Sequence, residues 1–377
     1  MPTNTAAWLP APYARLEVGP APYTSPGPDQ IVVRNHAIAV NPLEWIIQVA
    51  GPVVYRWLTY PTVLGSDVAG EVVEVGSAVT RFRVGDRVLG HAVGTDKDAN
   101  AAAQGGFQEH TVVLETLAAP IPDAMSFPSA AVLPLGLSTA ACGLFQRDQL
   151  ALRLPTADAP STGQTVLVWG GSTSVGSNAV QLAVAAGYEV VSTASPHNAD
   201  HVRSLGASQV FDYASPTVVR DIVAALAGHT LAGAFAIGNG STDACTEIVS
   251  ARGSGRKFVA VASTPISFAS LTAKDRPRFA LPRLLLRQGL AGVPTAVRGR
   301  VRGVSSKFVF GSSLKNNEVG PAIYRDFLPA ALADGRYRAA PEALVVGHGL
   351  GDVQHALDVQ AGGVSAKKVV VELVPGA

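Results

Sequence analysis

The stretch Trp169-Gly-Gly-Ser-Thr-Ser-Val-Gly176 decides how this sequence of 377 residues folds. It follows the apolar run Thr165–Trp169, which is typical of a buried strand, and precedes Asn178–Ala186, a helix-like segment that Gly187 would cap. Small residues at such a turn let a pyrophosphate approach the backbone and accept N–H donors from the helix N-terminus. The spacing Gly171-x4-Gly176 departs from G-x-G-x-x-G, so the strand-turn-helix context carries the prediction, and a tight turn without a ligand is the alternative.

Beyond this turn, strand-like and helix-like segments alternate. The expected strands are Glu189–Ala194, Gln209–Tyr213, Gly233–Ile237 and Lys257–Ala262, and the expected helices are Ala199–Leu205, ended by Gly206, and Val218–Ala227. This order predicts a doubly wound parallel sheet covered by helices. Val301–Gly311 fits a last strand of that sheet, whose open edge could pair with a second copy, although a shielded monomer is equally compatible.

The region before the turn has a different pattern. Its first 120 or so residues contain the short β segments Gln30–Val40, Ser66–Val75 and Arg81–Val88, the last interrupted by the turn dipeptide Gly85-Asp86. They predict a small barrel or sandwich that gives way to α/β structure near Ser126. The tail from residue 307 onward is expected to return to short strands and to end in Lys368–Glu372.

Composition limits the class of protein. Hydrophobic residues are 47% and charged residues 15%, which predicts a compact chain of two or three domains rather than a disordered one. Because 29 basic and 28 acidic residues leave a net charge of +1, nothing directs the protein to nucleic acid or an anionic membrane, and a small or neutral partner is favoured.

The sequence also indicates where the protein is located and whether it enters a membrane. Two long uncharged stretches, Ala124–Gln146 and Ala159–Tyr188, are interrupted by proline or glycine, so neither is expected to span a membrane. Only two cysteines occur, and the first residues lack the basic and apolar regions of a signal peptide. We therefore expect a cytoplasmic protein.

One segment, Thr264–Arg302, is strongly basic. It is expected to be a solvated segment or a site for an acidic partner such as a carrier protein. Its basic residues are Lys274, Arg276, Arg278, Arg283, Arg287, Arg298, Arg300 and Arg302, against Asp275 alone.

The end of the second strand bears on nucleotide choice. NAD enzymes place a carboxylate there, whereas this sequence has Ser195-Pro-His-Asn198, which favours NADP. His197 could instead be a surface histidine, and Tyr213 could flank an adenine or simply pack. Neither cysteine lies beside a histidine, so we expect no metal site.

At this point the sequence resembles the medium-chain dehydrogenase/reductase superfamily over essentially its whole length. The motifs are Val40-Asn-Pro-Leu-Glu-Trp45, Leu64-Gly-Ser-Asp-Val-Ala-Gly-Glu-Val-Val-Glu-Val-Gly76, Val84-Gly-Asp-Arg-Val88, Gly105-Gly-Phe-Gln-Glu109, Leu135-Gly-Leu-Ser-Thr-Ala-Ala141 and the terminal strand after Lys367. The resemblance implies a GroES-like β-rich domain from residues 1–125 and 310–377, with a Rossmann NADP-binding domain, residues 126–309, inserted between them.

Within that superfamily the sequence is similar to the zinc-independent branch. Zinc alcohol dehydrogenases have His followed by Glu after a Leu-Gly pair, whereas Ser66 and Asp67 stand here, and cysteine is absent near Asn41. The sequence most resembles trans-acting enoyl reductases that partner fungal polyketide synthases, through Gly171-Ser-Thr, Ser195-Pro-His-Asn198, Phe211-Asp-Tyr213 and Leu137-Ser-Thr139.

This resemblance implies roles for individual residues around NADPH. The pyrophosphate would be held by Gly171, Ser172, Thr173, Ser174 and Val175, the 2′-phosphate by Ser195, His197 and Asn198, and the adenosine side by Tyr213. Thr139 would face the nicotinamide, or cap a helix, and the remaining cofactor contacts would be Leu43, Ile46, Ile237, Val261, Ala262 and Lys367. Ile46 is a departure, because those reductases often carry lysine there, and it bears on the enoyl substrate.

The expected activity is NADPH-dependent reduction of an activated C=C bond in an enone, enoyl or quinone-like substrate, free or tethered to a carrier protein, in secondary metabolism. Hydride transfer must be followed by stabilisation and protonation of an enolate, for which Thr139, Tyr60, His91 and Glu44 are the candidate catalytic side chains. Three alternatives stay open: a zinc-free carbonyl reductase or alcohol dehydrogenase, an isomerase, and a catalytically silent cofactor-binding partner. The protein would be a monomer or a homodimer.

Overall fold

The computed structural model describes residues 3–252, 254–263, 299 and 301–374. These form two compact units: one holds the described residues up to Leu135 and from Tyr324 onward, and the other holds those from Gly136 to Ile323. The domain limits expected from the sequence, at residues 125 and 310, stay a prediction. The basic segment falls almost wholly outside the described residues.

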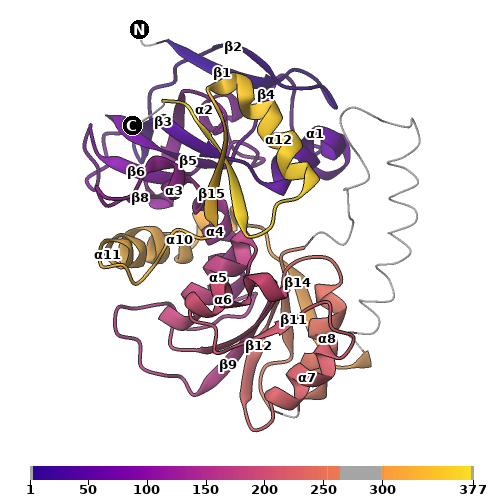
Figure 1. The fold of residues 1–377 in the computed structure, drawn as a ribbon. Coiled ribbons are helices and arrows are strands. Elements are labelled where there is room, and N and C mark those ends of the chain that lie inside the picture. The colour runs from indigo at the N-terminus through magenta and orange to yellow at the C-terminus, as the bar shows by residue number, and fades with distance from the viewer. Residues whose placement is uncertain (1–2, 253, 264–298, 300, 375–377) are drawn as a thin grey trace. The chain divides into compact units, whose positions relative to one another are not determined.

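The first unit is built on a β-sheet whose strands follow the order β15-β16-β3-β5-β6-β8, with β7 also paired to β3 (Figure 1). A smaller sheet has the order β2-β1-β4. Continuous runs of mostly apolar residues explain the buried strands, because β3 is buried over Ile31–Val33 and Asn35–Ala39, and Arg34 is the one exposed residue between them. The strands are β1 (Asn4–Leu9), β2 (Glu17–Ala21), β3 (Gln30–Ala39), β4 (Thr62–Val63), β5 (Asp67–Val75), β6 (Arg87–His91), β7 (His110–Leu114), β8 (Ala118–Pro120), β15 (Glu342–His348) and β16 (Lys367–Glu372).

Helices of the first unit cover this sheet and its ends. The helix α12 (Val353–Gly362) packs on β15, β16 and α1 (Pro42–Val54), because Val353, Ala356 and Leu357 recur at helical spacing and are buried (Figure 1). The shorter ones are α2 (Ala101–Gln104), α3 (Phe127–Ala131) and α11 (Leu328–Ala333).

The second unit is a six-stranded parallel sheet with the order β11-β10-β9-β12-β13-β14. Numbered along the chain, this is the order 3-2-1-4-5-6 of a doubly wound dinucleotide-binding fold. Its strands are β9 (Gln164–Trp169), β10 (Glu189–Ala194), β11 (Gln209–Asp212), β12 (Thr230–Ala236), β13 (Phe258–Val261) and β14 (Ser305–Phe308). Its helices are α4 (Pro134–Phe145), whose first two residues belong to the other unit, α5 (Ser174–Ala185), α6 (Ala199–Ser204), α7 (Val218–Ala225), α8 (Ser241–Ala251) and α10 (Val319–Pro321).

The predicted alternation in the second unit is confirmed, including a last strand within Val301–Gly311. Two predictions elsewhere were wrong in part. The turn expected at Gly85-Asp86 is confirmed, since the Asp86 carboxylate accepts the Arg83 N–H and Gly85 has φ of +95°. The strand expected on both sides of this turn begins only at Arg87. The tail holds α11 and α12 between its strands, because its apolar residues recur at helical spacing.

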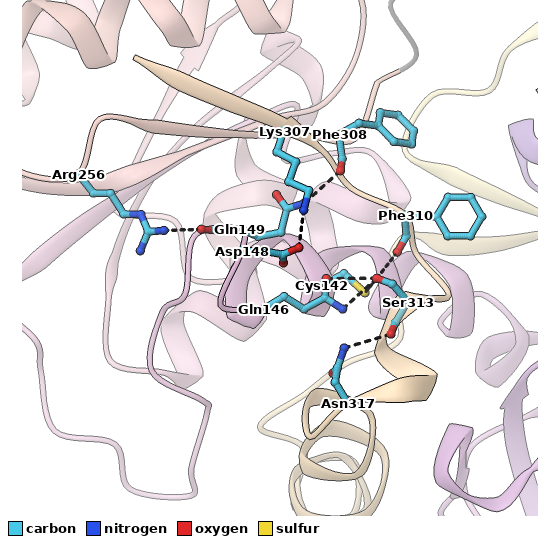
Figure 2. A network of polar contacts seen from close by, with 10 residues as sticks. All are labelled: Cys142, Gln146, Asp148, Gln149, Arg256, Lys307, Phe308, Phe310, Ser313 and Asn317. Atoms are coloured by element: carbon cyan, nitrogen blue, oxygen red, sulfur yellow. Dashed lines mark hydrogen bonds and ion pairs between the residues drawn. The ribbon is translucent and has the colours of Figure 1, made fainter. Parts of the chain in front are cut away.

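The edge strand β14 is fastened to the segment after α4 by polar side chains (Figure 2). Gln149 Nε2 donates to the Phe308 carbonyl over 3.0 Å, and the Lys307 ammonium pairs with Asp148. Ser313 Oγ donates to Cys142 Sγ over 3.4 Å. These contacts fix the last strand of the sheet and supply one of its edge carbonyls with a donor.

Phe127–Phe145, which contains α3 and α4, is long and apolar enough to cross a membrane by length and composition. Its 18-residue window is 78% buried inside the fold, as in a core helix of a globular protein.

Candidate functional site

The loop between β9 and α5 is held in one conformation by its own hydrogen bonds. Thr173 Oγ1 donates to the Gly170 carbonyl over 2.8 Å and accepts the Gly176 N–H over 3.0 Å, so it caps α5. Gly170 has φ of +85°, and a Cβ on Gly176 would lie 2.1 Å from the Gly170 carbonyl oxygen. Only glycine fits at Gly176, and its missing side chain lets the first turn of α5 pack directly on the backbone of Gly170 and Gly171.

This loop offers donors of the kind that a pyrophosphate needs. The first-turn N–H groups of α5, including those of Ser174 and Val175, point out of a helix N-terminus. Ser174 Oγ is buried and finds no hydrogen-bond partner among the described residues. Gly136 packs against it, since a Cβ there would lie 2.5 Å from Ser174 Oγ. Ser172 is half-buried and Thr173 is exposed, so both remain open to a ligand. The residues fit a dinucleotide pyrophosphate.

The neighbouring strand ends bring the predicted 2′-phosphate and adenosine residues together. Because β10 and β11 are parallel, with Ala194 opposite Asp212, Ser195 and Tyr213 leave the sheet side by side, and Ser195 Oγ donates to Tyr213 Oη over 3.2 Å. His197 is exposed and Asn198 is buried in the 3-10 turn after Ser195. The four residues directly after β10, Ser195–Asn198, carry no carboxylate. The nearby carboxylate of Asp212, at the end of β11, accepts the Ala214 N–H in its own turn.

The other residues predicted in this unit lie along the same edge. Ile237 follows β12, and Val261 and Ala262 end β13, with the Ala262 N–H donating to the Ala236 carbonyl over 2.9 Å. The Gly170 turn packs on Ile237, because a Cβ on Gly170 would lie 2.7 Å from the Ile237 carbonyl oxygen. Thr139 is half-buried on α4. The carboxyl ends of a parallel sheet are where such folds bind ligands.

In the first unit, Leu43 and Ile46 share one half-buried face of α1, three residues apart. Lys367 is paired with Glu342 on the surface of β15 and β16. Nothing in the structure tests whether these three residues contact a cofactor, so their roles stay predictions.

The candidate catalytic side chains of the first unit are largely buried. Tyr60 Oη lies against α1, where a Cβ on Gly51 would come within 2.6 Å of it, and no described residue forms a hydrogen bond with it. Burial raises the pKa of Tyr60. His91 is buried at the end of β6, opposite Asp67 in register. Glu44 is fully buried.

Glu44 belongs to a polar cluster that sequence reasoning did not assemble. We call Asn41, Glu44, Ser66, Asp67 and Lys368 the buried cluster, since each is at most 5% exposed. Glu44 accepts from the Asn41 N–H over 2.7 Å and from Ser66 Oγ over 2.9 Å. Burial, and next the charge of Asp67, raise the pKa of Glu44 to about 7, against the opposing effects of Lys368 and these two hydrogen bonds.

One pair of histidines has a spacing that occurs in metal sites. His197 and His201 have H-x3-H spacing, which the sequence interpretation overlooked. Among the described residues, no group of three or more histidine, cysteine, aspartate or glutamate side chains could hold a metal ion. Ser66 and Asn41, at the positions considered for zinc ligands, instead serve the buried cluster through hydrogen bonds to carboxylates.

Comparison with known proteins gives consistent matches. Residues 27–123 match the alcohol dehydrogenase GroES-like domain. The dehydrogenase pigH of Monascus ruber is 53% identical over 99% of this chain and 100% of its own length, and the trans-enoyl reductase himH of Aspergillus japonicus is 42% identical over 98% and 97%. The crystal structure of an alcohol dehydrogenase superfamily protein from Novosphingobium aromaticivorans superposes with a TM-score of 0.73 at 25% identity, covering 98% of this chain and 100% of that one. The expected fold, a GroES-like domain with a Rossmann-type α/β unit, is confirmed.

Proposed function

The chain belongs to the medium-chain dehydrogenase/reductase superfamily as an oxidoreductase, and we propose that it is an NADPH-dependent, zinc-independent reductase of an activated C=C bond in secondary metabolism. The observation that carries the proposal is the loop from Gly170 to Gly176, whose glycines and helix N-terminus match the needs of a pyrophosphate. The similarity to a trans-enoyl reductase over almost the whole chain supports the reaction class.

The preference for NADPH rests on the end of β10. A carboxylate there would accept from the ribose hydroxyls of NAD and repel a 2′-phosphate. Here the Ser195 hydroxyl, the His197 imidazole and the Asn198 amide offer donors instead. Tyr213, half exposed and bonded to Ser195, offers a flat surface for the adenosine side.

Bound NADPH would supply the hydride. The protein itself would bind the phosphates and hold the nicotinamide ring in place. The residues that would bind the phosphates are Gly171, Ser172, Thr173, Ser174 and Val175. For the nicotinamide end we propose Thr139 on α4, Leu43 and Ile46 on α1, Lys367 on β16, and Ile237, Val261 and Ala262 at the strand ends.

After hydride transfer, the enolate must be protonated, and the candidate catalytic residues differ most in their fitness for this step. Tyr60 is the proton donor that we favour, because a tyrosine is protonated at neutral pH and, among the described residues, its hydroxyl has no hydrogen-bond partner. Burial raises its pKa further. Glu44 and His91 are buried, and Glu44 already bonds to Asn41 and Ser66. A role for these two through neighbouring groups is more consistent with their burial than direct contact with substrate.

The substrate class is an enone, an enoyl thioester, free or carried on a carrier protein, or a quinone. A neutral protein with a net charge of +1 suits a small neutral substrate in the cytoplasm. A homodimer formed through β14 would require the free edge of this strand to form hydrogen bonds with a second copy of the chain. Gln149 already occupies the Phe308 carbonyl, which favours the monomer.

The test is a titration of the purified protein with NADPH and NADH, followed by nucleotide fluorescence, and then by a panel of enones, enoyl thioesters, quinones and aldehydes. We expect NADPH to bind more tightly than NADH and to be oxidised by an enone or enoyl thioester. Oxidation by aldehydes alone would identify a carbonyl reductase. Binding without any oxidation would indicate an isomerase or a silent partner, and absence of binding would refute the cofactor assignment.

A further inference from the structure

The buried cluster of the first unit joins segments that lie far apart in the sequence. Lys368 Nζ lies 2.8 Å from Asp67 Oδ2 and also donates to Asn41 Oδ1, although 327 positions separate Asn41 from Lys368. Asn41 Nδ2 in turn donates to Asp67 Oδ2 over 2.8 Å. Side chains of β16, β5 and the start of α1 are therefore bonded to one another, in addition to the backbone hydrogen bond from the Val40 N–H to the Val369 carbonyl.

The same cluster receives the N-termini of two helices. Asp67 Oδ1 accepts the N–H of Leu135, in the first turn of α4, over 2.5 Å. Glu44 accepts the N–H of Asn41 at the start of α1. First-turn N–H groups have no partner within their own helix, so a buried carboxylate that accepts one fixes where that helix begins.

Charge explains why Lys368 is required. Glu44 and Asp67 are both fully buried, and an unpaired buried carboxylate is strongly unfavourable. Among the described residues of the cluster, the ammonium of Lys368 is the one formal cation. The two helix N-termini add partial positive charge, roughly half a unit each. Without the ammonium, the charge of Asp67 would no longer be balanced, and its bond to Leu135 would weaken.

We propose that Lys368 and Asp67 are positioning residues that fix the start of α1, and so hold Leu43 and Ile46 in the orientation that the nicotinamide end of the cofactor requires. This rests on the proposed function. The buried cluster includes Asn41, which precedes the first residue of α1, and Glu44, the neighbour of Leu43. Neither Lys368 nor Asp67 needs to contact the cofactor.

The test compares Lys368→Met, Lys368→Arg and, as a matched control, Lys307→Met, which removes an ammonium from the exposed pair with Asp148. For each variant, NADPH is titrated by fluorescence, giving both the Kd and the emission of the bound nicotinamide at saturation. Steady-state kinetics with the best alkene then give kcat and KM. We expect Lys368→Met to keep the Kd and the KM for NADPH within about threefold, because the phosphates are held in the other unit. It should lose bound-state emission enhancement and lower kcat by at least about tenfold, as expected of a displaced reacting group.

A variant that restores the positive charge distinguishes a positioning role of Lys368 from general loss of folding. Lys368→Arg should recover most of kcat because it restores the cation, and Lys307→Met should match the wild type. Should Lys368→Met not fold, Asp67→Asn tests the same bond without a change of shape, and it should lower emission and kcat in the same direction. Wild-type emission and kcat in these variants would overturn the proposal, as would a loss of Kd equal to the loss of kcat. If the wild type binds NADPH but reduces no alkene, the proposed function fails, and the emission of the bound nucleotide still decides whether Lys368 positions it.

Discussion

Replacing Glu44 by glutamine should change how the stability of the protein depends on pH. The pKa of Glu44 is raised from 4.5 to about 7 in the folded protein, mainly by burial. Between these two values the folded state keeps the proton and the unfolded chain releases it, so the free energy of unfolding falls as pH rises from about 4.5 to about 7. At about 1.4 kcal/mol per pKa unit, the fall amounts to about 3 kcal/mol.

Glutamine cannot ionise, and its amide can still accept the Asn41 N–H and bond to Ser66. The stability of Glu44→Gln relative to the wild type should therefore rise by about 3 kcal/mol between pH 5 and pH 8. Urea titrations at fixed ionic strength, followed by tryptophan fluorescence, measure this, since Trp8, Trp45 and Trp57 lie in the same unit as Glu44. Glu17→Gln, on the exposed strand β2, is the control and should leave the pH dependence almost unchanged. If the curves of Glu44→Gln and wild type stay parallel over this range, Glu44 does not hold a proton near neutrality and the reasoning is refuted.

Three further predictions concern the nucleotide site. Gly176→Ala should raise the Kd for NADPH at least about tenfold, because its Cβ would collide with the Gly170 carbonyl. The control Gly351→Ala, where a Cβ meets nothing within 4 Å, should leave the Kd unchanged. Equal Kd values for the two variants in a fluorescence titration would contradict the prediction. Ser195→Asp should shift the ratio of NADH to NADPH affinity toward NADH by at least about tenfold through repulsion of the 2′-phosphate, and an unchanged ratio would argue against the assigned subsite. Thr173→Val should lower the free energy of unfolding by about 1 kcal/mol, because α5 loses its cap, and an unchanged urea midpoint would count against that role.

The fold of the second unit could be predicted from the sequence because its strands, turns and helix ends are determined by residues close together in the chain. Parallel strands buried on both faces form continuous apolar runs, and Gly187 and Gly206, both at positive φ, mark the ends of helices. The phosphate loop was predicted for the same reason, since its glycines and its capping threonine are adjacent in sequence. The hydrogen bond between Ser195 and Tyr213 was not predicted, although the parallel order of their strands brings the two residues together.

The buried cluster could not be predicted in the same way. Consecutive residues of a strand face opposite sides, and nothing local tells which of Lys367 and Lys368 faces inward. The sequence interpretation chose Lys367, which the structure places in an exposed pair, and passed over Lys368. One signal was present: Asn41 followed three residues later by Glu44 is a capping pattern, which assigns the carboxylate to the start of a helix.

The distance along the chain between the carboxylates and their cation affects how the protein is made. Glu44 and Asp67 leave the ribosome early, while Lys368 follows only after all residues of the second unit have been synthesised. During synthesis, the N-terminal sheet therefore lacks both β16 and the charge that its interior requires. The second unit, whose strands are contiguous in sequence up to β13, can fold first. The N-terminal half cannot complete its sheet until β16 has been synthesised. We therefore expect it to be the part of the nascent chain that depends most on chaperones.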